Sequence, residues 1–386
     1  MQRTAYLSKS KQFLLLTAVL IAAFAVAMTA AAPAHAATSK EYKGLLYYSA
    51  VKGGVYVMPM AKTKSVVIPA KIGKKKVVRL GAYSECKKLK KLSLKKAKYL
   101  QNVDIRETPK LTAVDLSKCP NLKEVKVCEN AKLTKLTMGT HKKLTKLQCD
   151  RCNIKKLNVS KCPKLKYLNT DYNANLATLT LGANKKLTEL WSQYCAIKKL
   201  NVSQCVKLKT LSCSHNKLTA LDVSKCTQLE ELGCSSNNIA SLNLAKNTKL
   251  ESVYAGGSGL NMIAALASVK LPATATLKTV SCVSAALTSL DASMCPNLED
   301  LHCERNKITT LKIPATSTLT WLNCSDNKIP MLDLRGCPNV SRLDCANNGL
   351  TAVLLSDNHV NFTSLRYYGN NIDDTSALRT RDPYAW

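Results

Sequence analysis

Residues 208–228 read LKTLSCSHNKLTALDVSKCTQ, and residues 229–249 read LEELGCSSNNIASLNLAKNTK. Both 21-residue segments place leucine, isoleucine, valine or cysteine at positions 1, 4, 6, 11, 14 and 16, with mostly polar residues between them. An apolar residue at every second position lies on one face of an extended segment, whereas a helix requires a different spacing. Each repeat therefore predicts two short strands.

The same register runs through most of the chain, with spacings of 21 or 22 residues except for 27 after Leu250. One turn cannot bury its own apolar side, but a dozen turns stacked about 4.8 Å apart share a core roughly 55 to 60 Å long. We expect a right-handed parallel coil, weakly curved because both sides of each turn are strand-like. The repeats begin at Leu100, Leu122, Leu144, Leu165, Leu187, Leu208, Leu229, Leu250, Leu277, Leu298, Leu319 and Val340.

The pattern L-x-x-L-x-C-x-x-N-x-L, followed by x-x-L-D-V-S-x-C, resembles the short 21-residue class of bacterial leucine-rich repeats. Residues 65–94 are similar to the start of BspA-type and internalin-like proteins, where I-P-x-x-I-G precedes C-x-x-L. The resemblance implies an all-β-rich leucine-rich-repeat solenoid, capped at both ends. It also implies that the position-9 asparagine points inward and bonds the backbone of the turn, a structural role for Asn173, Asn216, Asn237, Asn306, Asn327 and Asn348.

The first 36 residues have the features of a secretory signal: basic Arg3, Lys9 and Lys11, then an apolar run over 13–32, then Ala-His-Ala at 34–36. This arrangement predicts cleavage and export. An uncleaved membrane anchor is the alternative, because the apolar run approaches spanning length. We expect a secreted protein, with any cell-surface association being non-covalent.

The remaining chain divides into an N-terminal cap at 37–88, the repeats at 89–354 and a C-terminal cap at 355–386. Residues 42–59 alternate around Lys52-Gly53-Gly54, which predicts a hairpin within the first cap. The long repeat contains an insertion at 256–276, in which Leu260, Ile263, Leu266 and Ala267 have helical spacing. We expect a short helix there, serving either as a binding loop or as a neutral insertion.

Seventeen cysteines follow the repeat rather than a disulfide framework, because most lie at position 6 or 19, where leucine or valine would also serve. Cysteines stacked in adjacent turns have Cβ atoms about 4.8 Å apart, farther than the roughly 3.8 Å of a disulfide. We therefore predict mostly free, buried thiols. The single C-x-x-C, Cys149 and Cys152, occupies interior positions and indicates core packing rather than zinc or redox chemistry.

Catalytic residue combinations are missing from the sequence. After the signal, the histidines are His141, His215, His302 and His359, which fall on different turns. The acidic group Glu299, Asp300 and Glu304 could hold a cation or form a solvated face, and we favour the solvated face. We therefore expect a non-enzymatic protein with no catalytic residues, no metal site and no cofactor.

Aromatic residues mark one candidate binding face. The solvent-facing positions 3 and 5 of the first strand carry Tyr167, Trp191, Tyr254 and Trp321. Exposed aromatics of this kind are plausible anchors for a protein partner. Because they are separated along the repeats, scattered surface aromatics without a binding role are the alternative.

Charge marks a second candidate. Residues 38–210 contain 39 basic and 10 acidic side chains, whereas residues 211–386 contain 15 of each. A one-sided positive field attracts polyanions, although lysines also keep an apolar stack soluble. The candidate lysines are Lys87, Lys88, Lys90, Lys91, Lys95, Lys96, Lys142, Lys143, Lys146, Lys155 and Lys156.

These patterns predict an extracellular, adhesin-like binding scaffold that recognises a protein or an anionic polysaccharide or wall polymer. A structural protein held at a cell wall by its basic half is the alternative. Nucleic acid is not the expected partner, because the protein is exported and few aromatics interleave with the lysines. The sequence leaves the ligand's identity and the oligomeric state open.

Overall fold

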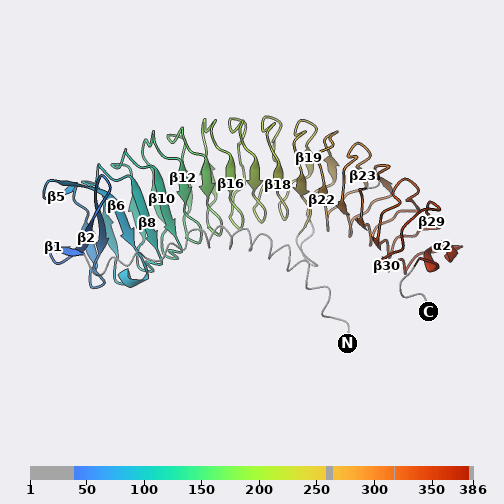
Figure 1. Cartoon of the computed structure of the whole chain (residues 1–386), viewed down its shortest axis with the longest axis horizontal. Helices are drawn as coiled ribbons and strands as arrows, with labels where there is room; N and C mark the ends of the chain where they lie inside the picture. The colour runs from blue at the N-terminus through green and yellow to red at the C-terminus, as the bar shows by residue number, and fades with distance from the viewer. Residues whose placement is uncertain (1–38, 258–263, 317, 382–386) are drawn as a thin grey trace.

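The computed structural model describes residues 39–257, 264–316 and 318–381. The predicted signal segment therefore lies outside the described residues. The described chain winds into successive turns whose strands stack in parallel, and the stack bends into an arch (Figure 1). Strands make up nearly all of its regular structure, as the repeat predicts.

A continuous sheet forms the inner, concave side of the arch. It contains 18 strands, and from β3 onward each strand that begins a new turn pairs in parallel with the strand of the preceding turn. The inner strands are β3 Gly54–Pro59, β6 Lys75–Ala82, β8 Asn102–Arg106, β10 Glu124–Cys128, β12 Lys146–Gln148, β14 Tyr167–Asn169, β16 Glu189–Trp191, β17 Thr210–Ser212, β18 Glu231–Gly233, β20 Ser252–Tyr254, β22 Thr279–Ser281, β24 Asp300–His302, β26 Trp321–Asn323, β28 Arg342–Asp344 and β30 Ser364–Arg366.

Shorter ladders form the outer, convex side, where strands pair only two at a time. Figure 1 shows β19, β23 and β29 on this side. The outer strands are β4 Ser65–Val67, β7 Lys91–Ser93, β9 Ala113–Asp115, β11 Lys135–Thr137, β13 Lys156–Asn158, β15 Thr178–Thr180, β19 Ser241–Asn243, β21 Ser268–Lys270, β23 Ser289–Asp291, β25 Thr310–Lys312, β27 Met331–Asp333 and β29 Ala352–Leu354.

The arch is more strongly bent than the weak curvature that we expected (Figure 1). The difference lies in the hydrogen bonding of the two sides. The unbroken inner sheet holds adjacent turns at the inter-strand spacing of about 4.8 Å. The outer side has only separate two-stranded ladders, so its turns can spread farther apart. Strand-like sequence on both sides does not guarantee equal pairing on both sides.

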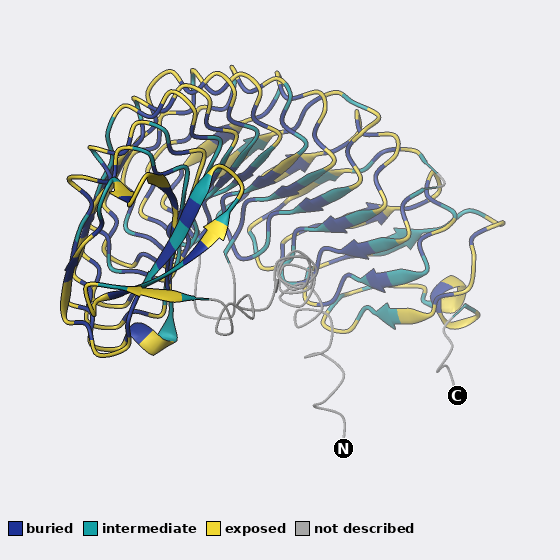
Figure 2. Cartoon of the chain, turned by 60° about the vertical axis from the view of Figure 1, so that its left-hand side comes forward, coloured by how far each residue is buried: buried dark blue, intermediate teal, exposed yellow. Residues whose placement is uncertain are grey.

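The core fills the space between the two sides. From β12 to β28 the middle residue of each inner strand points inward and is buried, as Leu168, Leu190, Leu211 and Leu232 show, whereas Leu365 of β30 is half-buried. The flanking residues of the same strands are half-buried or exposed on the concave surface (Figure 2). The period-two pattern of the sequence therefore separates core from surface along most of the inner sheet.

The N-terminal end contains the hairpin expected from the alternating residues. Strand β2 Leu46–Val51 pairs antiparallel with β3, and β1 Lys40–Tyr42 pairs antiparallel with β2. Strand β5 Lys71–Ile72 adds an antiparallel pairing to β6, and a 3₁₀ turn follows at Ser84–Cys86. These strands cover the first turn of the parallel stack, which would otherwise present an open sheet edge.

The C-terminal end continues the stack farther than the sequence suggests. Strand β30 lies within the predicted cap at 355–386, yet it pairs in parallel with β28. The only helix in the described part of the chain, α2 Ser376–Arg379, follows this last turn. The cap therefore begins after one further repeat, whose sequence has drifted while its backbone has kept the pattern.

The insertion does not form the helix expected within 264–276. Leu260 and Ile263 lie outside the described residues, whereas 264–267 have no regular structure and 268–270 form β21. The amides of Gly257 and Ala264 donate to the carbonyls of Val283 and Ser284 on the next turn. These are the bonds of an ordinary repeat, so Gly257 and Ala264 both lie on a regular turn of the solenoid. The helical spacing mixed residues from the insertion with residues of the regular core.

A left-handed residue turns the chain at the end of each inner strand. Position 8 has a positive φ of about 50° to 58° in eleven turns, although none of these residues is glycine. The conformation costs an L-residue roughly 1–2 kcal/mol, and it turns the backbone polar groups of the corner inward. The residues are Glu107, Glu129, Arg151, Tyr172, Tyr194, His215, Ser236, Ser284, Arg305, Asp326 and Asn347.

The next residue, position 9, satisfies the polar groups that this corner buries. The Nδ2 atom of Asn216 donates to the carbonyls of Ser192 on the preceding turn, at 2.7 Å, and of Cys213 on its own turn, at 3.0 Å. Its Oδ1 atom accepts the amide of Ile197 at 3.0 Å. One side chain thus bonds two turns together.

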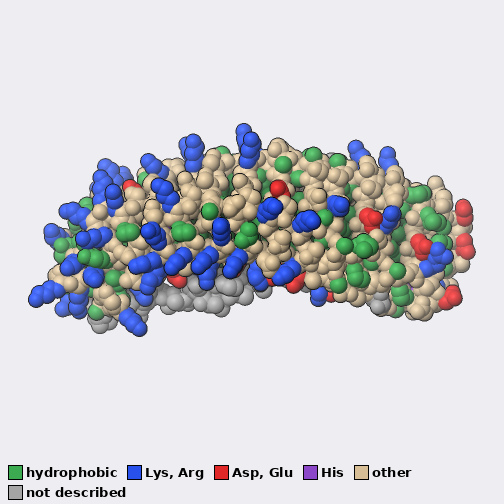
Figure 3. All heavy atoms as spheres, turned by 90° about the horizontal axis from the view of Figure 1, so that it is seen from above, with side chains coloured by type: hydrophobic (Ala, Val, Ile, Leu, Met, Phe, Trp, Pro, Cys, Tyr) green, Lys and Arg blue, Asp and Glu red, His purple; other side chains and the backbone are tan. Residues whose placement is uncertain are grey.

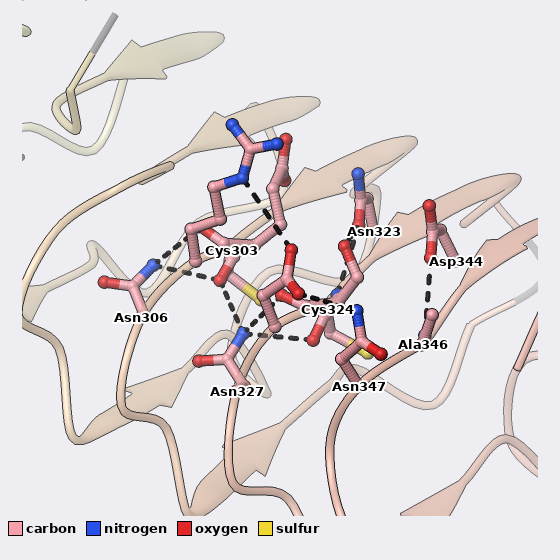
Figure 4. A network of polar contacts seen from close by, with 12 residues as sticks. Cys303, Asn306, Asn323, Cys324, Asn327, Asp344, Ala346 and Asn347 are labelled. Carbon is pink, nitrogen blue, oxygen red and sulfur yellow. Dashed lines mark hydrogen bonds and ion pairs between the residues drawn. The ribbon is translucent and has the colours of Figure 1, made fainter. Parts of the chain in front are cut away.

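The inward asparagines predicted from the sequence all make bonds of this kind. Figure 4 shows Asn306 and Asn327, both of which donate to the carbonyl of Cys303. Asn130 and Asn370, which the sequence analysis did not include, play the same role at either end of the series. The asparagine series therefore extends from residue 130 to residue 370.

Thiols replace the amide in two of these corners. The Sγ atom of Cys195 lies 3.3 Å from the carbonyl oxygen of Thr170 and 3.4 Å from that of Gln193. Cys152 makes equivalent contacts with Val127 and Asp150. All 17 cysteines are free and buried, which confirms the prediction of buried thiols. The thiol is a weak donor as well as a small apolar group, so these cysteines bond the corner while they fill the core.

Replacement of one inward asparagine should weaken the whole stack. In Asn216→Ala, the amide of Ile197 and the carbonyl of Ser192 lose their partners, so we expect a loss of about 2–4 kcal/mol in unfolding free energy. The exposed neighbour Asn238 supplies the control, Asn238→Ala, with an expected change below about 0.5 kcal/mol. Urea unfolding followed by circular dichroism measures both. Equal stability of the two variants would contradict the role given to Asn216.

Candidate binding surfaces

The four predicted aromatic anchors all lie on the concave sheet, half-buried, on strands β14, β16, β20 and β26. The four aromatic side chains do not form one continuous group. Tyr167 and Trp191 lie on adjacent strands, where Trp191 is in register with Asn169. Tyr254 and Trp321 lie on turns farther along the sheet.

Trp321 has the most developed surroundings. The imidazole of His302 packs edge-on against its indole, with centroids 4.3 Å apart and an interplanar angle of 88°. The guanidinium of Arg342 lies 4.7 Å from the indole centroid. Burial, with a smaller contribution from Arg342, lowers the pKa of His302 to about 4, so this imidazole is neutral at physiological pH. The group presents tryptophan and arginine together, the residues most enriched at binding hot spots.

The Tyr167 end has a similar composition. The ammonium of Lys146 lies 4.9 Å from the Tyr167 ring centroid, and the indole N–H of Trp191 donates to the Glu189 carboxylate at 3.5 Å. The concave face therefore has two groups that combine aromatic and cationic side chains, one around Tyr167 and one around Trp321. Both groups lie on the rigid inner sheet rather than on loops.

A third group was missed by the sequence analysis. Arg151, Tyr172, Tyr194 and His215 occupy position 8 in four successive turns, and we call them the corner stack. The rings of Tyr172 and Tyr194 are stacked 4.8 Å apart at 6°, and those of Tyr194 and His215 are stacked 4.1 Å apart at 10°. The Arg151 guanidinium lies 4.6 Å from the Tyr172 ring centroid. Tyr172 and Tyr194 remain 41% and 37% exposed, so the corner stack presents ring edges to solvent along the rim of the concave face.

The sequence signal for the corner stack is its spacing. Its members are separated by 21, 22 and 21 residues, which places them in one column of the solenoid. Strand alternation predicts outward-facing aromatics only at strand positions, and it assigns the corner a structural role. The left-handed backbone at position 8 directs the side chain outward, and this property cannot be inferred from strand alternation.

The predicted lysines do not form one surface. Lys146 was expected to lie with the other lysines. It lies instead on the concave strand β12 beside Tyr167, because it belongs to an inner strand. Lys91 and Lys156 begin outer strands. The other candidates are exposed in turns outside the inner sheet: Lys87, Lys88, Lys90, Lys95, Lys96, Lys142, Lys143 and Lys155.

Figure 3 looks onto the convex face and shows lysine and arginine side chains crowded over the N-terminal half. The positive charge inferred from the sequence is therefore located mainly opposite the concave aromatics. Within residues 39–257, 264–316 and 318–381, no lysine before Lys209 forms an ion pair. The positive charge of these lysines is therefore not neutralised by carboxylates within ion-pair distance.

The described residues contain no group of three or more His, Cys, Asp or Glu side chains placed to hold a metal ion. No helix in the same residues is long and apolar enough to cross a membrane. Glu299 lies within ion-pair distance of Lys278, and burial raises the pKa of Glu304 to about 7, so the acidic group around residue 300 is not the uniformly solvated face that we favoured. Its members instead have different environments.

Two consecutive repeats, residues 206–253, match the family model for "Leucine Rich repeats (2 copies)". The described turns have the parallel stacking of that family and almost no helix. The fold is a leucine-rich-repeat solenoid. Comparison with curated protein sequences finds no significant match.

Solved leucine-rich-repeat structures are similar to this solenoid. A leucine-rich-repeat protein of Leptospira interrogans is 19% identical with a TM-score of 0.52, and the alignment covers 83% of this chain and 88% of that one. A chain of the LRIM1/APL1C complex is 20% identical with a TM-score of 0.51, covering 76% and 63%. At these identities the likeness concerns the fold alone.

The functional domain of InlJ from Listeria monocytogenes, which includes a cysteine ladder, is 25% identical with a TM-score of 0.49. The alignment covers 67% of this chain and 60% of that domain. The chain thus matches less than two thirds of the length of that domain.

A buried carboxyl group beside the corner stack makes the stability of the solenoid depend on pH. Asp171 accepts the amide of Gln193 at 2.7 Å, and its burial raises its pKa from 3.8 to about 7. Because the folded state binds this proton more tightly than the unfolded state, the associated stability is present below about pH 4 and is lost as pH rises through about 7.

Asp171→Asn keeps an oxygen acceptor for Gln193 and removes the ionisation. At pH 8.5 we expect the unfolding free energy of the variant to exceed that of the wild type by an amount on the order of 1–3 kcal/mol, so the variant unfolds at a higher temperature. At pH 5 the two proteins should unfold at nearly the same temperature. The exposed Asp357→Asn serves as the control, with no such pH-dependent difference. Thermal unfolding at the two pH values measures this, and an equal difference at both would contradict the buried-carboxyl account.

Proposed function

We propose that this protein is a non-catalytic, extracellular binding scaffold that recognises a protein partner through its concave face. The observation that carries the proposal is the group of Trp321, Arg342 and His302 on the inner sheet. A second aromatic and cationic group surrounds Tyr167 and Trp191, and the corner stack lies at the rim. Export rests on the signal-like residues 1–36.

A protein partner fits these features better than a small ligand. The anchors are spread from β14 to β26 along a continuous sheet, so a ligand that contacts several of them must be long. Half-buried tryptophan and tyrosine side chains offer contact area at low entropic cost. The similar solenoids of the LRIM1/APL1C complex also occur in a protein assembly, which supports this reading of the fold.

Screening of the purified protein against an array of secreted and cell-surface ectodomains tests the proposal. For an ectodomain that binds, we expect Trp191→Ala and Trp321→Ala each to weaken affinity at least tenfold, because truncation of a hot-spot tryptophan typically costs 2 kcal/mol or more. Met331→Ala, an exposed residue on the outer strand β27, is the matched control and should leave affinity unchanged.

Thermal unfolding of each variant separates a loss of contact from a loss of fold. Trp191 and Trp321 lie on the solvent side of their strands, so both variants should retain the circular dichroism spectrum of the wild type. Binding that survives both tryptophan changes but is lost in Met331→Ala would contradict the assignment to the concave face. Failure of the wild type to bind any ectodomain would contradict a protein partner.

A further inference from the structure

The outer strands carry a column of lysines that stops halfway along the arch. The first residue of the outer strand is Lys91, Lys135 and Lys156 in β7, β11 and β13, whereas β9 and β15 begin with the uncharged Ala113 and Thr178. Lys199 occupies the same repeat position two turns after Lys156, and all four are exposed. In the second half, the corresponding residues are uncharged: Ser241, Ser268, Ser289, Thr310, Met331 and Ala352.

This restriction to one half argues against solubility as the sole reason for the lysines. The C-terminal half has the same outer strands and remains polar with serine and threonine, so the fold does not require a cation at this position. Two lysines of that half also pair with acids, Lys278 with Glu299 and Lys312 with Asp291. The N-terminal lysines lack such pairs among the described residues and together form a field of one sign.

The shape of the surface indicates the kind of partner. The lysines cover the outside of an arch (Figure 3). A flat anionic surface, such as a membrane, touches a convex body only along a narrow strip. A flexible chain can instead follow the arch, and lysines spaced one or two turns apart can each meet one of its repeated charges.

The choice of residue indicates how the anion is recognised. Of the 39 basic residues at 38–210, only Arg79, Arg106 and Arg151 are arginines. Lysine is a point charge without the planar fork with which arginine reads carboxylate or phosphate geometry. The most exposed tyrosines in the described residues, Tyr172, Tyr194 and Tyr368, lie outside the outer strands, so platforms for stacking bases are not interleaved with the lysine column.

We propose that the convex N-terminal half binds a linear, non-aromatic polyanion by charge. The site is separate from the concave face and does not depend on the partner proposed for that face. The polymer's carboxylate, sulfate or phosphate groups would contact the column formed by Lys91, Lys135, Lys156 and Lys199. The concave anchors would remain accessible while the polymer is bound, since they lie on the opposite side of each turn.

Two charge-reversal variants of the full chain test the location. Lys135→Glu with Lys156→Glu changes the convex face, and Lys126→Glu with Lys146→Glu changes the concave face of the same two turns. Both variants alter the net charge equally, so a difference between them reports the position of the lysines. The probe is fluorescently labelled long-chain inorganic polyphosphate, with binding followed by anisotropy.

We expect the convex variant to bind polyphosphate at least tenfold more weakly than the wild type, and the concave variant within threefold of it. Wild-type affinity should fall steeply between about 50 and 500 mM salt, because each contact is screened. Equal weakening in both variants, or binding unaffected by salt, would overturn the proposal. Circular dichroism confirms that both variants are folded.

Two further probes distinguish other anionic partners. Vesicles containing an anionic phospholipid and a single-stranded DNA of matched charge are measured under the same conditions. We expect weaker binding to both than to polyphosphate, since the convex face meets a membrane along a narrow strip and offers few stacking platforms. Tighter binding to vesicles would indicate a membrane surface, and tighter binding to DNA would indicate a nucleic acid; either result would replace the proposed polymer.

Discussion

The hydrogen bonds of the inward-pointing asparagines are the interaction on which the rest of this structure depends. At eleven corners the chain leaves the inner strand through a left-handed residue, and the bend buries amides and carbonyls that no strand ladder can reach. The side chains of Asn173, Asn216 and Asn237 bond these groups across adjacent turns. Thiols at residues 152 and 195 contact the equivalent carbonyls. Without these bonds the apolar stack would enclose unsatisfied backbone at these corners.

The same corners determine what the surface can carry. Because position 9 points inward, position 8 points outward, and a residue type repeated there becomes a column on the rim. The corner stack of Tyr172, Tyr194 and His215 follows from this geometry. On the two broad faces, alternation within each short strand separates buried leucine from surface residues, so each face can vary without disturbing the core. Aromatic anchors occupy the concave face, and the lysine column occupies the convex one.

The sequence predicted the features that depend on local periodicity. The strand pattern, the buried leucines, the free thiols and the inward asparagines all repeat at a fixed interval, and the structure confirms them. The curvature was underestimated because it depends on which side pairs continuously, a property of hydrogen bonding rather than of residue type. The helix expected near Leu266 was wrong because residues from an insertion and from a regular turn were considered as one segment.

The candidate sites were predicted less completely than the fold. The four aromatics are on the face that was expected, but Lys146 accompanies Tyr167 there instead of joining the other lysines. The corner stack was missed because the direction of the position 8 side chain depends on a positive φ. A composition-based charge count located the basic half of the chain, and only the structure separated its concave and convex faces.

Amide hydrogen exchange of the native protein tests the central claim about the corners most directly. The amides of Ile154, Ile197, Leu218 and Ile308 donate to inward asparagine oxygens. The account predicts that they exchange as slowly as amides of the inner sheet, since they are released only when neighbouring turns separate. The amides of Ser117 and Ser160 bond exposed side-chain oxygens of Asp115 and Asn158 and should exchange far faster. Exchange of the four corner amides as fast as that of Ser117 and Ser160 would contradict the account.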